Sequence, residues 1–280
     1  MLYLRSNRRH FAESSAFIPP MFNSLRPLLT AFVCVVILTP SLSHAADKWI
    51  TVGHTGPFTL KSEYKDDAHA GLLEELADLQ LDLSATLKLE ITKKPIQIFL
   101  FRHKRNYQSY LSQRVPEGAS RQALFVKGDK FSQVYAYAHW GYDTDIRHEG
   151  THAVLHNALP YLPLWLDEGL AEYFEETALN RASDHPHLKA LRWSTRLGSA
   201  PSLTDLETKS KLSEFGASDY REAWAYVHFF LHGGDEARQV LVAYLAEIQA
   251  GRPPGKMSQF AAERIPDLDR RVVNHLSSWK

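Results

Sequence analysis

Residues 148–152 read HEGTH, and residues 165–173 read WLDEGLAEY. On a helix, the spacing of the first segment places two imidazoles one turn apart on the same face, with the Glu149 carboxylate beside them. Neutral imidazole nitrogens bind zinc well, and a helix holds two of them rigidly at this spacing. The segment therefore predicts that His148 and His152 are zinc ligands and that Glu149 is the general base.

The second segment supplies what HEGTH lacks, because a catalytic zinc typically has three protein ligands and one open position. Glu168 and Glu172 are one helical turn apart, so they share a face of the second helix. We expect Glu168 to be the third ligand. We expect Glu172 to accept the other ring N–H of His148 or His152 and so to orient that ring. The alternatives are that both glutamates lie on a solvated helix face, or that HExxH arose by chance among 14 histidines.

The two segments together resemble the gluzincin branch of zinc metallopeptidases, in which the third ligand is a Glu on a second helix. The likeness is to the peptidase MA-like families, which include exported bacterial proteins. Residues 163–173 are similar to their P-x-W-L-x-E-G-L-A-E-Y segment, and residues 220–231 resemble a later helix. The resemblance implies a zincin-like fold, a zinc-dependent peptidase and the same residue roles. It also implies that the strand at 133–138 is the sheet edge on which an extended peptide lies.

A peptidase of this kind also needs a donor for the oxyanion that develops on the substrate. The resemblance places a tyrosine at position 220, so Tyr220 is the first choice, and Tyr226 and His228 are rivals. The alternative is that Tyr220 only packs as an aromatic side chain. His156 continues the four-residue spacing, but we expect it at the surface or the helix end, where a cation suits a helix C-terminus.

Periodicity on either side of HEGTH predicts an α+β fold. A small mixed sheet with helices is expected before the motif, and a mainly helical half after it. The domain would span 46–280, with a sheet part at 46–142 and a helical part at 143–280. Strands are expected at 49–61 (with a turn inside), 95–101, 124–126 and 133–138. Helices are expected around 72–83, 106–111, 143–157, 164–176, 220–232, 236–250 and 268–279, and 181–214 reads as loop with short helices.

The first 45 residues have the three regions of a secretory signal peptide. An apolar run at 28–38 follows Arg26 and precedes a small-x-small cleavage signal that ends at Ala45. Met21 is expected to be the true start, which makes residues 1–20 an over-extended beginning. The protein is therefore expected to be exported, periplasmic or secreted. The alternative is an uncleaved N-terminal anchor, which would be its one attachment to a membrane.

Composition narrows the function further. Lys plus Arg and Asp plus Glu number 32 each, so no bulk charge indicates nucleic acid as a partner. The single cysteine, Cys34, lies inside the apolar run, so the exported chain would hold metal only through His, Asp or Glu. The expected activity is zinc-dependent hydrolysis of a peptide or protein substrate. The alternatives are a non-catalytic zinc-containing peptide-binding module of the cell envelope and a zinc hydrolase of a non-peptide amide. Cleavage specificity, endo- or exopeptidase action and oligomeric state are open.

Overall fold

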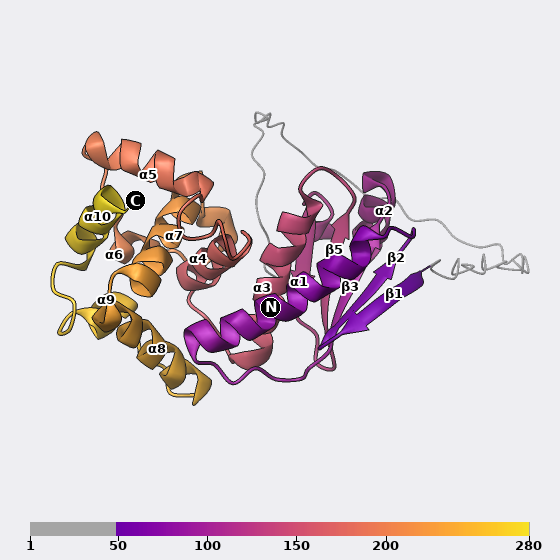
Figure 1. Ribbon diagram of the computed structural model, residues 1–280, viewed down its shortest axis with the longest axis horizontal. Coiled ribbons are helices and arrows are strands. Elements are labelled where there is room, and N and C mark those ends of the chain that lie inside the picture. Colours follow the sequence, from indigo (N-terminus) through magenta and orange to yellow (C-terminus); the bar gives the residue numbers. More distant parts are fainter. Residues whose placement is uncertain (1–48, 280) are drawn as a thin grey trace, which may run out of the picture. The chain divides into compact units, whose positions relative to one another are not determined.

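A five-stranded mixed sheet dominates the first half of the computed structural model, which describes residues 49–279 (Figure 1). The predicted signal segment, 1–45, falls outside the described residues. The strand order is β1-β2-β3-β5-β4, in which β2, β3 and β5 are parallel and the two outer strands are antiparallel to their neighbours. The elements of this half are β1 (Ile50–Thr55), β2 (Phe58–Ser62), α1 (Ala68–Leu87), β3 (Ile96–Phe101), α2 (Lys104–Arg114), the 3-10 turn η1 (Pro116–Gly118), β4 (Ala123–Val126) and β5 (Ser132–Tyr137).

Both faces of the sheet are covered, and the alternation of side chains along each strand decides which helix covers which face. On β3, Ile98 and Leu100 point to the face that packs against the leucines of α1 and against α3 (Tyr142–Ala158). Phe99 and Phe101 point the other way, into an aromatic cluster with Tyr107 of α2. Burial on both faces explains why β3 reads as a continuous apolar run rather than an alternating one.

The strand expected at the edge of the sheet is not the edge. β5 pairs with β3 on one side and with β4 on the other, so it is an interior strand. The expectation that 133–138 would carry an extended peptide is therefore wrong. The hairpin turn after β4 returns the chain on the inner side, which leaves β4 as the edge strand nearest to α3.

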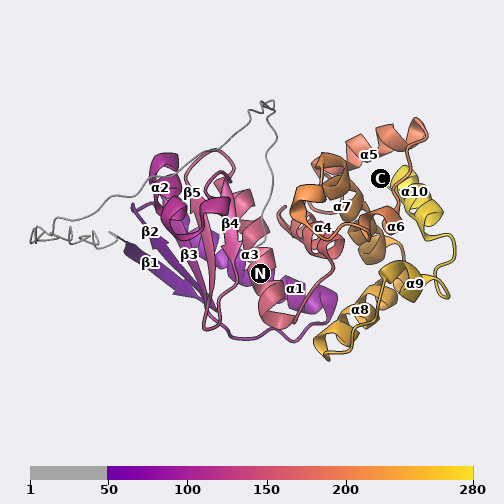
Figure 2. The same cartoon turned by 180° about the vertical axis from the view of Figure 1, so that it is seen from behind.

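The second half is mainly helical, which confirms the predicted α+β class (Figure 2). The elements that follow α3 are α4 (Leu164–Phe174), α5 (Pro186–Arg196), α6 (Leu203–Leu206), the 3-10 turn η2 (Leu212–Glu214), α7 (Ala217–His232), α8 (Asp235–Gln249), α9 (Met257–Ala261) and α10 (Leu268–Ser278). The helix α5 occupies part of residues 181–214, which were expected to be loop with short helices.

The helix α4 is the centre of this half, and every one of its residues is buried. It packs against α3 on one side and against α7 on the other. A Cβ on Gly169 would lie 2.6 Å from the carbonyl oxygen of Ala223, so only glycine allows α4 and α7 to come this close. This close packing fixes the position of the neighbouring residue, Glu168, relative to α3.

Among residues 49–279, no helix combines the length and the apolar character that crossing a bilayer requires.

Candidate metal site

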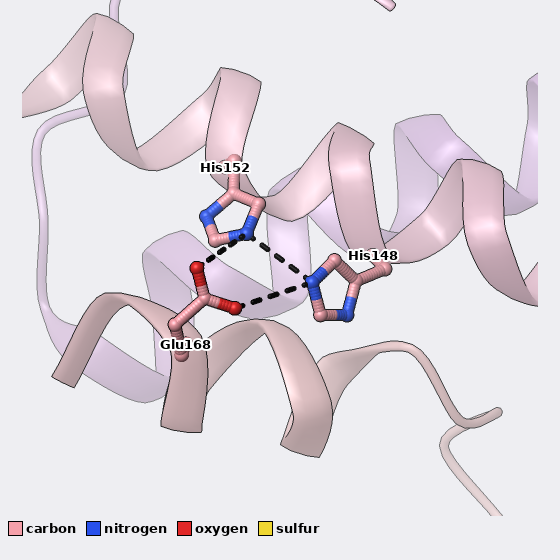
Figure 3. A group of neighbouring side chains, drawn as sticks. All are labelled: His148, His152 and Glu168. Carbon is pink, nitrogen blue, oxygen red and sulfur yellow. Dashed lines mark hydrogen bonds and ion pairs between the residues drawn. The ribbon is translucent and has the colours of Figure 1, made fainter. Parts of the chain in front are cut away.

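Two imidazoles from adjacent turns of α3 face each other in the interior. His148 and His152 are both buried, and their Nε2 atoms are 3.2 Å apart (Figure 3). Glu168 approaches from α4, with Oε2 at 3.7 Å from Nε2 of His148 and Oε1 at 3.8 Å from Nε2 of His152. The structure therefore brings together the three residues that the sequence predicted as ligands.

The ligand atoms are near enough to one another to hold a metal ion. Zn–N and Zn–O bonds of about 2.0–2.1 Å with tetrahedral angles separate the ligand atoms by about 3.3 Å. The two Nε2 atoms, 3.2 Å apart, match that value, and the Glu168 carboxylate approaches each ring with a different oxygen at the longer distances of 3.7 and 3.8 Å. A buried group of two histidines and a glutamate that could hold a metal ion is thus present on α3 and α4.

Carboxylates hold the outer nitrogen of each ring. Nδ1 of His148 is 2.7 Å from Oε2 of Glu175, and Nδ1 of His152 is 2.9 Å from Oδ1 of Asp167. An ionised carboxylate only accepts, so each Nδ1 is assigned as the N–H donor, and the lone pair of each neutral ring is then on Nε2. Two lone pairs that face each other across 3.2 Å repel unless a cation lies between them. The tautomers that these carboxylates select are those that a metal ion needs.

The electrostatics of the site favour positive charge. Burial lowers the pKa of His152, but the Asp167 and Glu168 carboxylates raise it more, so the overall direction is upward. Burial alone would raise the pKa of Asp167, but the His156 and His152 rings lower it well below its usual range. Asp167 is therefore ionised at neutral pH.

His156 does not lie at the surface, contrary to the expectation from sequence. It is buried, and its Nε2 is 2.8 Å from Oδ2 of Asp167. Asp167 thus bridges two histidines of α3, with one carboxylate oxygen on each. The reason is the crossing of α3 and α4, which places the residue before Glu168 against two successive turns of α3. His156 therefore fixes Asp167, which in turn fixes the ring of His152.

Glu172 was the carboxylate expected to orient a ligand ring, and one of its oxygens contacts a histidine of another helix. Its Oε2 is 2.8 Å from Nε2 of His187, a residue at the start of α5. Its carboxylate is still near those of the site, since ligand atoms of His148, Glu172 and Glu175 lie within 4.8 Å of one another. The Nδ1 atoms of His148 and His152 donate to Glu175 and Asp167, respectively.

Glu149, the predicted general base, links the site to the sheet edge. It is buried on α3, and its Oε2 accepts a hydrogen bond of 2.7 Å from the backbone N–H of Phe125 on β4. An N–H that reaches α3 points away from β5, so Phe125 and Ala123 direct their backbone groups to the open side of β4. The candidate base therefore stands at the open side of β4, where it accepts the Phe125 N–H.

The three candidates for the oxyanion donor differ in position. Tyr226 donates its hydroxyl to Asp269 on α10, and His228 contacts the Ala182 carbonyl and His275. These contacts occupy the polar atoms of both side chains. Tyr220 is buried at the start of α7, and it interacts electrostatically with Arg121, whose charge also interacts with Glu149 and Glu168.

Arg121 is a residue of this region that the sequence did not single out. It lies in the turn before β4 and is 9% exposed, and its charge interacts with Glu149, Tyr220 and Glu168. Burial lowers its pKa to about 10, which leaves it charged at neutral pH, while the two glutamates act in the opposite direction. The sequence signal was weak, because one arginine in a polar turn is ordinary. Only the fold brings it near HEGTH.

The part of the chain that is similar to a known protein family includes this site. No curated protein matches the sequence significantly. Residues 142–254 match the profile of a family described as "Protein of unknown function (DUF1570)", and this stretch runs from the start of α3 past the end of α8. The three candidate ligands, Glu149 and the carboxylates behind the rings all fall within the part of the chain that is similar to that family.

Proposed function

We propose that the protein is a zinc-dependent peptidase in which His148, His152 and Glu168 bind one zinc ion. The observation that carries the proposal is the convergence of two imidazole Nε2 atoms and a carboxylate, with both Nδ1 atoms held by other carboxylates. Two nitrogens and one oxygen are the protein ligands of many catalytic zinc sites, which keep a fourth position open. A zinc ion held there would act as a Lewis acid and lower the pKa of water.

Glu149 is the proposed general base. It neighbours His148 on α3, so it cannot turn toward the ligand position in the way that Glu168 does. Its carboxylate is held at Oε2 by the Phe125 amide and forms no other hydrogen bond with the described residues. The second oxygen is therefore available to take a proton from water and to return it to the leaving amine.

The proposed substrate is an extended peptide beside β4. Peptides recognised by strand addition pair through backbone groups, which favours peptides without fixing their sequence. Ala123 and Phe125 direct such groups to the open side of β4, and Glu149 stands at the same side. Tyr220 is the proposed donor to the oxyanion, because its two rivals are engaged elsewhere.

The test is metal analysis of the purified chain from residue 46, with a mass-spectrometric digest of a broad peptide library. We expect one zinc ion per chain and cleavage products. Removal of the metal with a chelator should abolish cleavage, and added zinc should restore it. Bound zinc without cleavage of any peptide would favour the non-catalytic binding module instead.

A further inference from the structure

Two polar groups near the site lack partners within the described residues. The Nε of Arg121 and the hydroxyl of Tyr107 are buried and form no hydrogen bond with residues 49–279. Arg121 also forms no ion pair there, although its charge interacts with those of Glu149 and Glu168. A buried nitrogen of a guanidinium without a partner is unfavourable, and such groups in native proteins have a functional explanation or an unseen partner.

The two groups belong together. Tyr107 lies on α2, and the charge of Arg121 stabilises the ionised form of its hydroxyl, so the side chains are close enough to interact. Burial and Glu149 outweigh this effect and raise the pKa of Tyr107, so the hydroxyl keeps its proton. Both side chains are therefore hydrogen-bond donors and one carries a positive charge, which is the chemistry that recognises an anion.

Their position along the edge strand gives the anion a place in the substrate. Arg121 lies in the bend that leads into Ala123, and its charge interacts with Glu149. Glu149 is bonded farther along the same strand, at Phe125. A peptide that pairs with Ala123 would therefore extend from the general base at one end to the guanidinium at the other.

We propose that Arg121 and Tyr107 form a subsite that binds a carboxylate of the peptide close to the scissile bond. This inference rests on the proposed peptidase function, because that function supplies the substrate. The carboxylate comes from the C-terminus of the peptide or from an Asp or Glu side chain. A planar guanidinium fork binds either one in the same bidentate way. Arg121 is thus a specificity-determining residue.

The test measures binding, so it does not depend on turnover. Zinc-loaded Glu149→Gln protein is mixed with three acetylated hexapeptide libraries of matched composition. The first has a free C-terminal carboxylate and no acidic side chain. The second is amidated and contains one Asp or Glu, and the third is amidated and uncharged. Bound peptides are quantified by mass spectrometry after equilibrium dialysis.

We expect one of the two carboxylate libraries to bind about 10- to 100-fold more tightly than the uncharged one, the range of a charge-assisted hydrogen bond. The library that is preferred identifies the source of the carboxylate. Arg121→Gln should remove the preference, and Tyr107→Phe should reduce it by about 3- to 10-fold. Arg105→Gln, which removes an exposed arginine of α2, should leave it unchanged.

Equal binding of all three libraries, or an unchanged preference in Arg121→Gln, would overturn the subsite. If Arg121→Gln does not fold, the same binding measurement is made on Tyr107→Phe, which keeps the buried ring, and on Arg121→Lys, which keeps the charge.

In the active protein, Arg121→Gln should raise KM for the preferred peptides and leave kcat nearly intact. A fall in kcat that is equal for charged and uncharged peptides would instead place Arg121 at the oxyanion and overturn the proposal. Carboxylate preference without any cleavage would contradict the peptidase and leave the subsite standing.

Discussion

At the scale of single residues, carboxylates behind the two rings support the candidate metal site. Glu175 accepts from Nδ1 of His148, and Asp167 accepts from Nδ1 of His152. Each contact fixes the tautomer and the rotation of a ring, so that Nε2 points to Glu168. Removal of such a partner typically weakens metal affinity by about 10- to 100-fold.

Glu175→Gln should therefore weaken zinc binding by about 10-fold or more, because a neutral amide holds the ring N–H less strongly. The measurement is a competition titration against a chelator of known affinity. Glu176→Gln is the matched control, since the adjacent Glu176 has no contact with either ring. Equal zinc affinity in the two variants would show that Glu175 does not support the site.

The sequence was enough to pick out the three residues that converge, but not the contacts of Asp167 and Glu175 with the rings, for a physical reason. His148, His152 and Glu149 are related by the period of one helix, and a helix fixes its own side-chain spacing. The supporting contacts depend on how α4 crosses α3. Glu172 shares a face with Glu168, but the crossing brings Asp167 and Glu175 against the rings instead.

At the scale of elements, the close packing of α4 on α7 positions Glu168, the third candidate ligand. A Cβ on Gly169 would meet the backbone of Ala223 at 2.6 Å and Cγ2 of Val227 at 2.9 Å. A backbone contact cannot be relieved by a change of rotamer, so the helices would have to separate. Glu168 is adjacent, so it would move with α4.

Gly169→Ala should lower the free energy of unfolding by about 1–3 kcal/mol, as overpacking does in well-packed cores. The same variant should bind zinc more weakly. Urea unfolding and the chelator titration measure the two effects.

The matched control is Gly71→Ala on α1, where a Cβ has nothing within 4 Å. That change should be neutral or stabilising, because alanine favours helix over glycine. Destabilisation by Gly71→Ala and none by Gly169→Ala would contradict the packing argument.

The elements themselves were largely predictable, and their arrangement was not. The apolar run at 95–101 and the leucines of 72–83 identify β3 and α1 by their period. The position of β4 at the edge depends on which side of β5 a hairpin folds, and local periodicity contains no such information. The same limit hid Arg121, which lies in a turn that only the sheet brings beside α3.

At the scale of the whole described chain, buried histidines of the helical half set a pH dependence of stability. Burial lowers the pKa of His228 to about 3 and those of His185 and His275 to about 4. Their polar atoms are used in internal contacts, such as the 2.9 Å contact between Nδ1 of His228 and Nε2 of His275. The folded chain therefore keeps these rings neutral where the unfolded chain protonates them.

The direction in which stability changes with pH follows from the number of protons that each state binds. Below the ordinary histidine pKa of about 6.5 the unfolded state binds protons that the folded state does not, so stability falls as pH falls. The loss should continue to about pH 4, at roughly 1.4 kcal/mol per pH unit for each proton taken up. Urea unfolding between pH 7 and pH 4.5, with a chelator present throughout, measures it without a contribution from metal loss. His275→Gln should flatten this dependence, and His54→Gln on the sheet should not. The same slope in all three proteins would contradict the assignment.

The catalytic proposal rests on Glu149 acting as a base beside a bound zinc ion. Glu149→Gln keeps the size of the side chain and an oxygen that can accept from Phe125, but it cannot take a proton. We predict that this variant binds one zinc ion per chain, as the unmodified protein does. We also predict that its kcat on a library-derived peptide falls by about 10²- to 10⁴-fold. Unchanged turnover at full zinc occupancy would contradict the account.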